Sequence, residues 1–233
     1  AGAAGTPRGA LLSASPELLV EFDGRHARTR PIKGTAPRGA TPDEDRARAE
    51  ALLASAKDRA ELAMIVDLER NDLGRCARAG GVHVERFPEL ETYASVHHLA
   101  ADVRADIAPG RDAFDLLAAL FPGGSISGAP KLASLAAIAE LEGAGRGFFS
   151  GSAGFVDTRG RAAWNILIRT LVWRPEPGPG AGEVSFHVGG GITWASDAAV
   201  EDAETLAKGL ALARALAAPG EAPYASLAPE RAG

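Results

Sequence analysis

The sequence predicts an α+β protein in which mixed or antiparallel sheets are flanked by helices. Helical and strand patterns alternate irregularly along the chain, and neighbouring strand patterns are joined by short turns. A doubly wound parallel sheet would instead need a helix between successive strands. The Pro/Gly-rich stretch 175–182 is typical of a hairpin loop, which supports the same fold class.

Two local signals mark the first elements. Asp23-Gly24 separates two apolar stretches and predicts a hairpin turn between short strands. Thr41 followed by Pro42 and Glu44 predicts the start of a helix, because Thr is a good N-cap, Pro fits the first turn, and Glu three residues after the cap completes a capping box.

The remaining elements follow from periodicity. We expect helices over about 41–74 with one break, 112–120, 129–141 and 197–217. We expect strands over about 16–22, 28–32, in several short runs within 82–107, and over 148–156, 163–173 and 183–194. The segment 121–128 is a glycine-rich connection between helices.

Composition excludes several protein classes. The chain has 233 residues with 46% hydrophobic and 24% charged residues and a net charge of −5, which is typical of a globular protein. No apolar run approaches the roughly 20 residues that span a bilayer, and no basic run indicates nucleic-acid binding. The single Cys76 cannot form an intrachain disulfide, so we expect a reducing, cytoplasmic location.

Two acidic pairs share a helical spacing. Asp58 and Glu61 are three residues apart on one expected helix, and Glu201 and Glu204 are three apart on another, with Lys208 on the same face. Such pairs are ordinary on solvated helix faces. If both pairs faced one common site, their oxygens would suit Mg²⁺.

Glycine-rich segments and one arginine suggest anion binding. Segments 123–128 and 189–191 would let backbone N–H groups approach an anionic ligand, although tight turns explain them equally well. Period-2 alternation places Asn165, Leu167 and Arg169 on one strand face. Arg169 then needs either a protein carboxylate or a substrate carboxylate as partner.

A lysine and two histidines complete the candidates. Lys33 lies in Pro-Ile-Lys-Gly-Thr; most lysines are surface residues, and a nucleophilic one would have to be deprotonated. His97 and His98 point to opposite faces of a strand, so one of them at most faces a given site.

Five motifs together resemble those of the chorismate-utilising enzymes, which include anthranilate, aminodeoxychorismate, isochorismate and salicylate synthases. They occur in the family's order: residues 31–39 (PIKGTAPRG), 61–74 (ELAMIVDLERNDLG), 121–131 (FPGGSISGAPK), 189–191 (GGG) and 201–208 (EDAETLAK). The resemblance implies the anthranilate synthase-like fold over 13–217, with a flexible lead-in at 1–12 and a flexible tail at 218–233. It also implies that the family's N-terminal lobe and first strands are missing.

The Lys33 motif resembles the aminodeoxychorismate synthase branch of that family, because anthranilate synthases usually have Ala at this position. The resemblance implies that Lys33 attacks C2 of chorismate while the C4 hydroxyl leaves, and that ammonia then adds at C4 and expels the lysine. Glu17 matches the acid that assists departure of the hydroxyl. His98 and Ser125 match active-site positions.

The same matching assigns the remaining site residues. Glu61 and Glu204 match direct Mg²⁺ ligands, and Asp58 and Glu201 match acids that hold metal-bound water. The expected substrate-binding residues are Gly34, Thr35, Arg169, Gly189, Gly191 and Lys208. Two departures are notable, since Asp58 stands where Glu is common and Phe149 stands where anthranilate synthases have Tyr.

The resemblance therefore predicts aminodeoxychorismate synthase component I, which makes 4-amino-4-deoxychorismate for para-aminobenzoate and folate biosynthesis. The expected ammonia source is a separate glutamine amidotransferase subunit or free ammonium, because the nucleophilic Cys motif of the amidotransferase is absent. Anthranilate synthase component I is one alternative. A non-catalytic chorismate- or partner-binding fragment is another.

Overall fold

The computed structural model describes residues 2–6, 9–94, 96–177, 182–194 and 196–217. The chain divides into two compact units, one formed by Pro16–Ile166 and one formed by Ala1–Ser15 together with Leu167–Gly233. We call them the central unit and the terminal unit. This division differs from the single region 13–217 that the sequence suggested, and the expected tail 218–233 lies outside the described residues.

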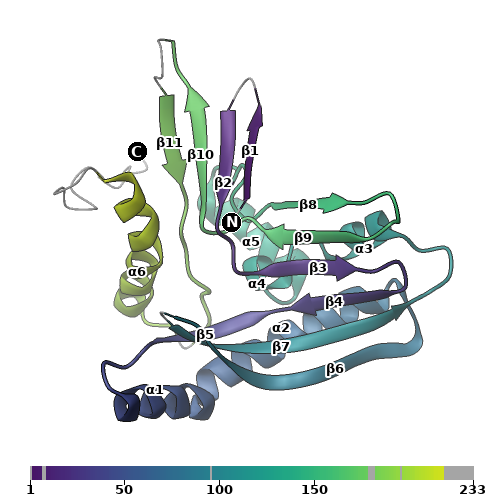
Figure 1. The fold of residues 1–233 in the computed structure, drawn as a ribbon, viewed down its shortest axis with the longest axis horizontal. Coiled ribbons are helices and arrows are strands. Elements are labelled where there is room, and N and C mark those ends of the chain that lie inside the picture. The colour runs from purple at the N-terminus through teal and green to yellow at the C-terminus, as the bar shows by residue number, and fades with distance from the viewer. Residues whose placement is uncertain (1, 7–8, 95, 178–181, 195, 218–233) are drawn as a thin grey trace. The chain divides into compact units, whose positions relative to one another are not determined.

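The central unit contains a seven-stranded antiparallel sheet (Figure 1). Its order is β5-β7-β4-β3-β9-β8, and β6 also pairs with β7. The strands are β3 (Leu18–Phe22), β4 (His26–Arg30), β5 (Ile32–Pro37), β6 (Ala77–Thr92), β7 (Val96–Ile107), β8 (Ser152–Val156) and β9 (Ala162–Ile166). The expected short runs within 82–107 are thus two long strands, β6 and β7.

Five helices of the central unit lie among the described residues, and their ends follow the capping chemistry. They are α1 (Pro42–Ala54), α2 (Ala56–Gly74), α3 (Ala113–Leu120), α4 (Gly124–Ser127) and α5 (Lys131–Glu142). Thr41 caps α1 by accepting a hydrogen bond from the Glu44 N–H, while the Glu44 carboxylate accepts from the Ala40 N–H. Asp112 caps α3 in a complete capping box. The predicted N-cap at Thr41 is confirmed, but the predicted capping box is not formed, because Glu44 accepts from Ala40 rather than from Thr41.

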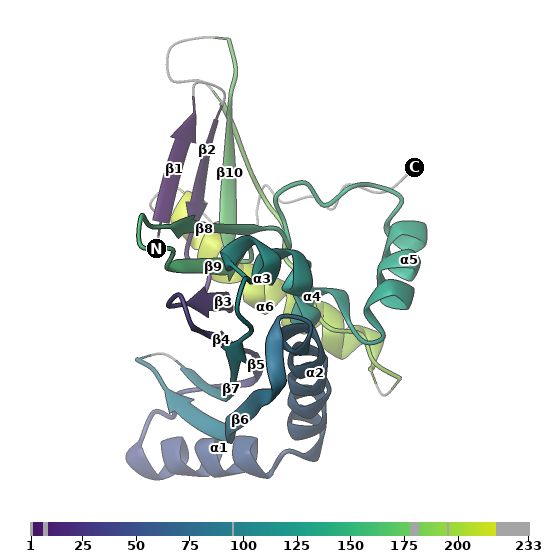
Figure 2. The ribbon, with the colours of Figure 1, turned by 90° about the vertical axis from the view of Figure 1, so that its right-hand side faces the viewer.

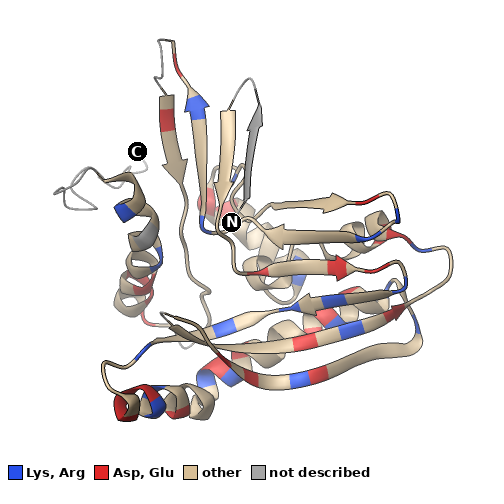
Figure 3. Ribbon diagram, in the orientation of Figure 1, with Lys and Arg blue, Asp and Glu red and all other residues tan. Residues whose placement is uncertain are grey.

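The core of the central unit lies where α2 packs on the sheet. Helix α2 contacts β5, β6 and β7, and Figure 2 shows it alongside these strands. The buried residues of α2 recur every three or four positions, as a helix with one covered face requires. They include Leu62, Ile65, Val66 and Leu73, and the sheet contributes buried residues such as Val20, Leu99 and Val103. Helix α1, in contrast, carries charges of both signs and is largely exposed (Figure 3).

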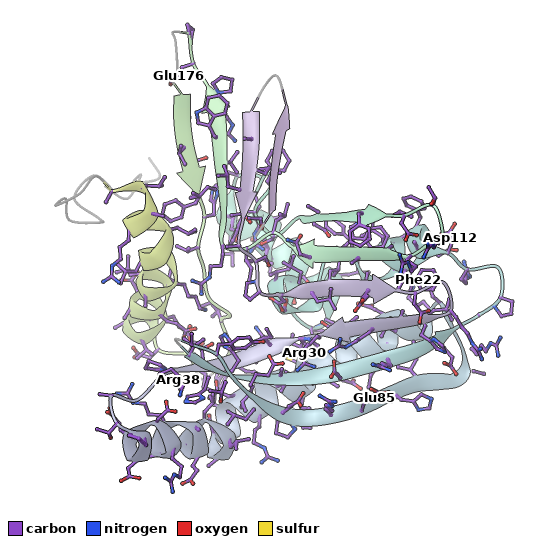
Figure 4. The ribbon with its side chains drawn as sticks, viewed as in Figure 1. Phe22, Arg30, Arg38, Glu85, Asp112 and Glu176 are labelled. Atoms are coloured by element: carbon purple, nitrogen blue, oxygen red, sulfur yellow. The ribbon has the colours of Figure 1, made fainter. Side chains whose placement is uncertain are left out.

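Charged residues of β4 form an ion-pair network with β6 and β7. Arg30, labelled in Figure 4, donates hydrogen bonds to Asp102, Glu89 and Glu91, and Arg28 donates to Asp102 at 2.7 Å. Side chains alternate along a strand, so this network and the neighbouring Thr29 lie on opposite faces of β4. One face of the sheet is therefore apolar and covered by α2, and the other carries paired charges.

The terminal unit contains a four-stranded antiparallel sheet and one long helix. The sheet order is β1-β2-β10-β11. The elements are β1 (Gly2–Thr6), β2 (Gly9–Ser13), β10 (Thr170–Pro175), β11 (Gly182–Phe186) and α6 (Ala198–Leu216), with Asp197 as the N-cap of α6. The segment 1–12, for which we expected a flexible lead-in, supplies β1 and most of β2.

Several expected strands have different limits. The single strand expected over 163–173 is two strands, β9 and β10, because the backbone at Arg169 has a φ of 51° and cannot continue an extended strand. The strand expected over 148–156 begins at Ser152, and the strand expected over 183–194 ends at Phe186. Among the described residues, no helix is long and apolar enough to cross a membrane.

Gly154 on β8 provides a test of the sheet packing. A Cβ at this position would lie 2.0 Å from the Ala163 carbonyl oxygen and 2.5 Å from the Trp164 ring. We expect Gly154→Ala to lower the free energy of unfolding by about 2 kcal/mol, because neither the backbone nor the buried ring can move freely. Gly145→Ala is the matched control, since nothing lies within 4 Å of its Cβ. Equal urea midpoints for the two variants would contradict this packing.

Candidate active site

Strand β5 brings together several of the predicted site residues. The Lys33 Nζ donates a hydrogen bond to the Ser125 carbonyl at 3.4 Å. The Thr35 hydroxyl and the His98 Nδ1 are 2.8 Å apart. Between them, Gly34 packs against Asp58, because a Cβ on Gly34 would lie 3.0 Å from that side chain. Three consecutive residues of β5 therefore contact three separate candidate residues.

A β-bulge produces this arrangement. Lys33 pairs with Leu99 of β7, and Thr35 pairs with His98, so the register shifts between Lys33 and Thr35. Gly34 lies at the shift with a φ of 76°, a conformation that glycine adopts without strain. The bulge explains why the motif needs glycine between the lysine and the threonine.

The two histidines have different surroundings. His97 is 2% exposed, and its ring nitrogens lie 2.9 Å from Asp45 on α1 and 2.9 Å from the Thr92 hydroxyl. His98 is partly exposed, and its ring packs edge-on against Tyr93 with centroids 5.7 Å apart. His97 therefore holds α1 on the sheet, and His98 is the histidine that faces the Lys33 region through Thr35.

Ser125 lies in the short helix α4. Its hydroxyl is buried and has no hydrogen-bond partner among the described residues, so it is free to bind a ligand oxygen. The adjacent glycines serve packing, since a Cβ on Gly124 would lie 2.8 Å from Leu68. An apolar cavity of about 150 Å³ next to α4 is lined by Ile126, Phe149 and neighbouring residues, and none of the four predicted catalytic side chains lines it.

The acidic pairs belong to different units. Asp58 and Glu61 are half-buried in the first two turns of α2, and Lys57 Nζ lies 4.0 Å from Glu61 Oε1. Glu201 and Glu204 lie on α6 in the terminal unit. Hard carboxylate oxygens of this kind fit Mg²⁺, which takes a few carboxylates and keeps waters as its other ligands. No cluster of three or more metal-ligating side chains occurs among the described residues.

The terminal unit gathers the predicted anion-binding residues around α6. The Arg169 guanidinium donates a hydrogen bond to the Lys208 carbonyl, and burial lowers the pKa of Arg169 from its usual value. Lys208 Nζ lies 2.6 Å from Glu204 Oε1 and 3.4 Å from the Gly189 carbonyl. The predicted face shared by Asn165, Leu167 and Arg169 is wrong, because β9 ends at Ile166 and Arg169 lies outside both strands.

Glu201 occupies a separate, buried position on the same helix. It is 6% exposed, and its Oε1 accepts a hydrogen bond from Ser196 at 2.8 Å. A Cβ on Gly190 would lie 3.1 Å from Glu201 Oε2, so the glycine loop packs closely on this carboxylate. Gly191 is exposed.

Sequence reasoning missed two buried acids of the central unit, Glu69 and Asp72. Both lie on α2 and are 5% exposed, and the predicted acid Glu17 is 7% exposed. Asp72 Oδ2 lies 2.6 Å from Lys131 Nζ, which also donates to the Leu120 carbonyl at 3.0 Å. The signal was present, because both acids fall on the apolar stripe of α2 rather than on its polar face.

Glu69 differs from the other acids in its proton affinity. Burial raises the pKa of Glu69 to about 8, although the hydrogen bond from Thr29 acts to lower it. The charges of Glu17 and Asp72 raise it further, and Lys131 lowers it. The Thr29 hydroxyl donates to Glu69 Oε2 at 2.5 Å from a fully buried position on β4. Glu69 is therefore mostly protonated at neutral pH.

A model of the family described as chorismate binding enzyme matches residues 3–214. The chain belongs to this family. Anthranilate synthase component 1 of Streptomyces coelicolor is 45% identical over 206 residues, which cover 88% of this chain and 39% of that protein. Aminodeoxychorismate synthase component 1 of Bacillus subtilis is 41% identical over 211 residues, covering 91% and 44%.

A solved structure extends the comparison to the fold of this chain. The crystal structure of anthranilate synthase component I from Streptococcus pneumoniae TIGR4 matches with a TM-score of 0.71 and 33% identity. The match covers 87% of this chain and 43% of that one. The predicted α+β class and the family resemblance are confirmed. The chain spans less than half the length of these relatives.

The buried Lys131–Asp72 pair can be tested by substitution. We expect Lys131→Met to lower the free energy of unfolding by about 3 kcal/mol, because it leaves the Asp72 carboxylate buried without its cation. The double variant with Asp72→Asn should recover part of that loss. Arg70→Met is the control, since its pair with Asp67 is exposed and contributes less than about 1 kcal/mol. Urea unfolding checks all three, and a Lys131 effect no larger than the control contradicts the pairing.

Proposed function

We propose that this chain is the chorismate-binding region of an aminodeoxychorismate synthase component I. The observation that carries the proposal is the position of Lys33 at the bulge of β5. Its Nζ lies 3.4 Å from the Ser125 carbonyl, and the Thr35–His98 contact follows directly along the strand. A lysine at this position provides a nucleophilic amine, which an alanine would not provide.

The proposed reaction has two displacements. The neutral Lys33 amine forms a bond to C2 of chorismate, both ring double bonds shift toward C4, and the C4–oxygen bond breaks as the hydroxyl leaves. A proton from Glu17 makes that leaving group water. Ammonia then bonds to C4, both ring double bonds shift back, and the C2–nitrogen bond to Lys33 breaks. The products are 4-amino-4-deoxychorismate and the restored lysine.

Other residues of the central unit bind and orient the substrate in this proposal. The Ser125 hydroxyl is available to donate to a substrate oxygen because it has no partner among the described side chains. The contact between the Thr35 hydroxyl and His98 Nδ1 fixes the orientation of the His98 ring, which would orient the substrate. Gly34 has no side chain and would allow the substrate to approach the backbone closely.

Carboxylate binding is assigned to the terminal unit and a metal ion. Arg169, Lys208 and the backbone of Gly189 and Gly191 would bind carboxylates of chorismate. Glu61 and Glu204 would hold Mg²⁺, with Asp58 and Glu201 holding its waters. The ion would supply the positive charge that lets an acidic protein bind a dianion.

Membership of the aminodeoxychorismate synthase branch would also imply a pathway, a location and a partner subunit. The product would serve para-aminobenzoate and folate biosynthesis in the cytoplasm. Ammonia would come from a separate glutamine amidotransferase subunit, in keeping with the "component 1" in the name of the Bacillus relative.

Anthranilate synthase component I is the second candidate. The Streptomyces relative of that name is 45% identical and the Bacillus aminodeoxychorismate synthase 41%, so overall identity does not favour our proposal. Lys33 separates the two candidates, because only the aminodeoxychorismate route uses it as a nucleophile.

Product analysis tests the proposal. The full chain incubated with chorismate, Mg²⁺ and ammonium should form 4-amino-4-deoxychorismate, and Lys33→Ala should reduce the rate by roughly 100-fold or more. Arg159→Ala, in an exposed turn of the central unit, is the control. Anthranilate plus pyruvate as the main products would contradict the assignment. Mg²⁺-dependent chorismate binding without turnover would favour a binding fragment.

Magnesium binding is a separate prediction. Titration calorimetry should detect Mg²⁺ binding to the chain in the presence of chorismate, and Glu61→Gln should weaken it at least about tenfold by removing a charged ligand. Glu85→Gln, an exposed change on β6, should leave it unaltered. Equal affinities for the Glu61 variant and the control would contradict the ligand assignment.

A further inference from the structure

Two cationic side chains bind neighbouring carbonyl groups of α4. This helix has only four residues, so most of its carbonyls have no N–H partner within the helix. The Ser125 carbonyl accepts a hydrogen bond from Lys33 Nζ at 3.4 Å. The next carbonyl, that of Ile126, accepts one from Arg146 Nη1 at 3.0 Å. Positive charge suits this part of a helix, because the carbonyl dipoles point toward its C-terminal end.

The Arg146 guanidinium is held on several sides. Its Nη2 and Nε donate to the two carboxylate oxygens of Glu142, the last residue of α5, at 2.6 and 2.9 Å. Its Nη1 also donates to the Ser150 hydroxyl at 3.2 Å. The guanidinium carbon lies 5.6 Å from the centroid of the Phe149 ring. Because the planar group is fixed by these contacts, the direction of its hydrogen bond to α4 is fixed as well.

The backbone at Ser150 is strained. Ser150 is 7% exposed and has a φ of 64°, which is unfavourable for a residue with a side chain. Such a conformation persists only where the surrounding contacts compensate for it. The hydrogen bond from Arg146 is one of these contacts. The turn that follows α5 is therefore built to present its hydroxyl to the arginine.

Apolar packing of α4 on α5 is incomplete. The two helices contact each other (Figure 2), but the cavity of about 150 Å³ described above is lined by Ile126 on α4 and by Leu135 and Ile138 on α5. Side chains that border a cavity lack contact atoms on that side. Arg146 also lines this cavity, so its hydrogen bond to the Ile126 carbonyl connects α4 to α5 where apolar contacts are missing.

We propose that Arg146 is a positioning residue that acts through Ser125, an inference that rests on the proposed function. By holding the Ile126 carbonyl, Arg146 fixes the peptide next to Ser125. The Ser125 carbonyl then stays against Lys33, and the buried Ser125 hydroxyl stays where the proposed function requires a donor to a substrate oxygen. A displacement of about 1 Å in such contacts can lower a rate roughly 100-fold.

Lysine labelling tests this connection without substrate. The full chain is treated with limiting acetic anhydride, and acetylation is followed by mass spectrometry with the half-exposed Lys57 as the internal reference. Arg146→Met removes the donors that hold α4, so acetylation of Lys33 relative to Lys57 should become at least about threefold faster. The control is Arg161→Met, which also removes an arginine that pairs with a carboxylate four residues away, Asp157. Equal Lys33 labelling in the two variants would overturn the proposal.

Turnover gives the second readout, because a positioning role predicts effects that are not additive. Arg146→Met should lower kcat/KM roughly tenfold or more. In a Ser125→Ala background the same change should cost less than about threefold, since the hydroxyl that Arg146 positions is already absent. An equal loss in both backgrounds would contradict the positioning role.

A second variant covers the case in which Arg146→Met does not fold. Glu142→Gln weakens the hold on the guanidinium at the exposed end of α5, and it should change labelling and turnover in the same directions by smaller factors. Wild-type behaviour of Glu142→Gln in both measurements would count against the proposal. If the chain does not convert chorismate at all, the proposed function fails, while the labelling of Lys33 still decides whether Arg146 holds α4 in place.

Discussion

The packing of α2 against the antiparallel sheet determines most of what the central unit can do. One face of this helix supplies the aliphatic core residues, and the same helix places Asp58 against Gly34, Glu69 against Thr29 and Asp72 against Lys131. Apolar burial supplies the stabilising free energy that offsets the cost of enclosing these polar groups. The acidic residues of α2 are therefore held by the helix that forms the core of the central unit.

Much of the fold could be predicted from local signals, because turns and helix starts depend on the chemistry of a few neighbouring residues. Asp23-Gly24 allows a positive φ at Gly24, and Thr41 and Asp112 satisfy N–H groups at helix starts, so these boundaries agree with the structure. Strand limits were less predictable, because pairing depends on partners distant in sequence. The break between β9 and β10 at Arg169 is an example, since no residue in this apolar stretch indicates a backbone φ of 51° at a non-glycine position.

In the candidate site, too, some features could be predicted from the sequence and others could not. Family motifs identified Lys33, Thr35, His98 and Ser125, and the structure brings these residues together in pairs. Periodicity alone could not supply the register shift that makes this possible. Glu69 was missed for a different reason: the motif comparison gave it no role, although its place on the apolar stripe of α2 indicated burial.

The bulge at Gly34 has a consequence for how this segment tolerates insertions and deletions. In a regular strand a change of one residue reverses which face every later side chain occupies. Because Gly34 is the extra residue in β5, a chain without it would keep the pairing with β7 but regain regular alternation, so Lys33 and Thr35 would lie on opposite faces of the strand. Sequence length between the lysine and the threonine is thus as strictly constrained as their chemical identity.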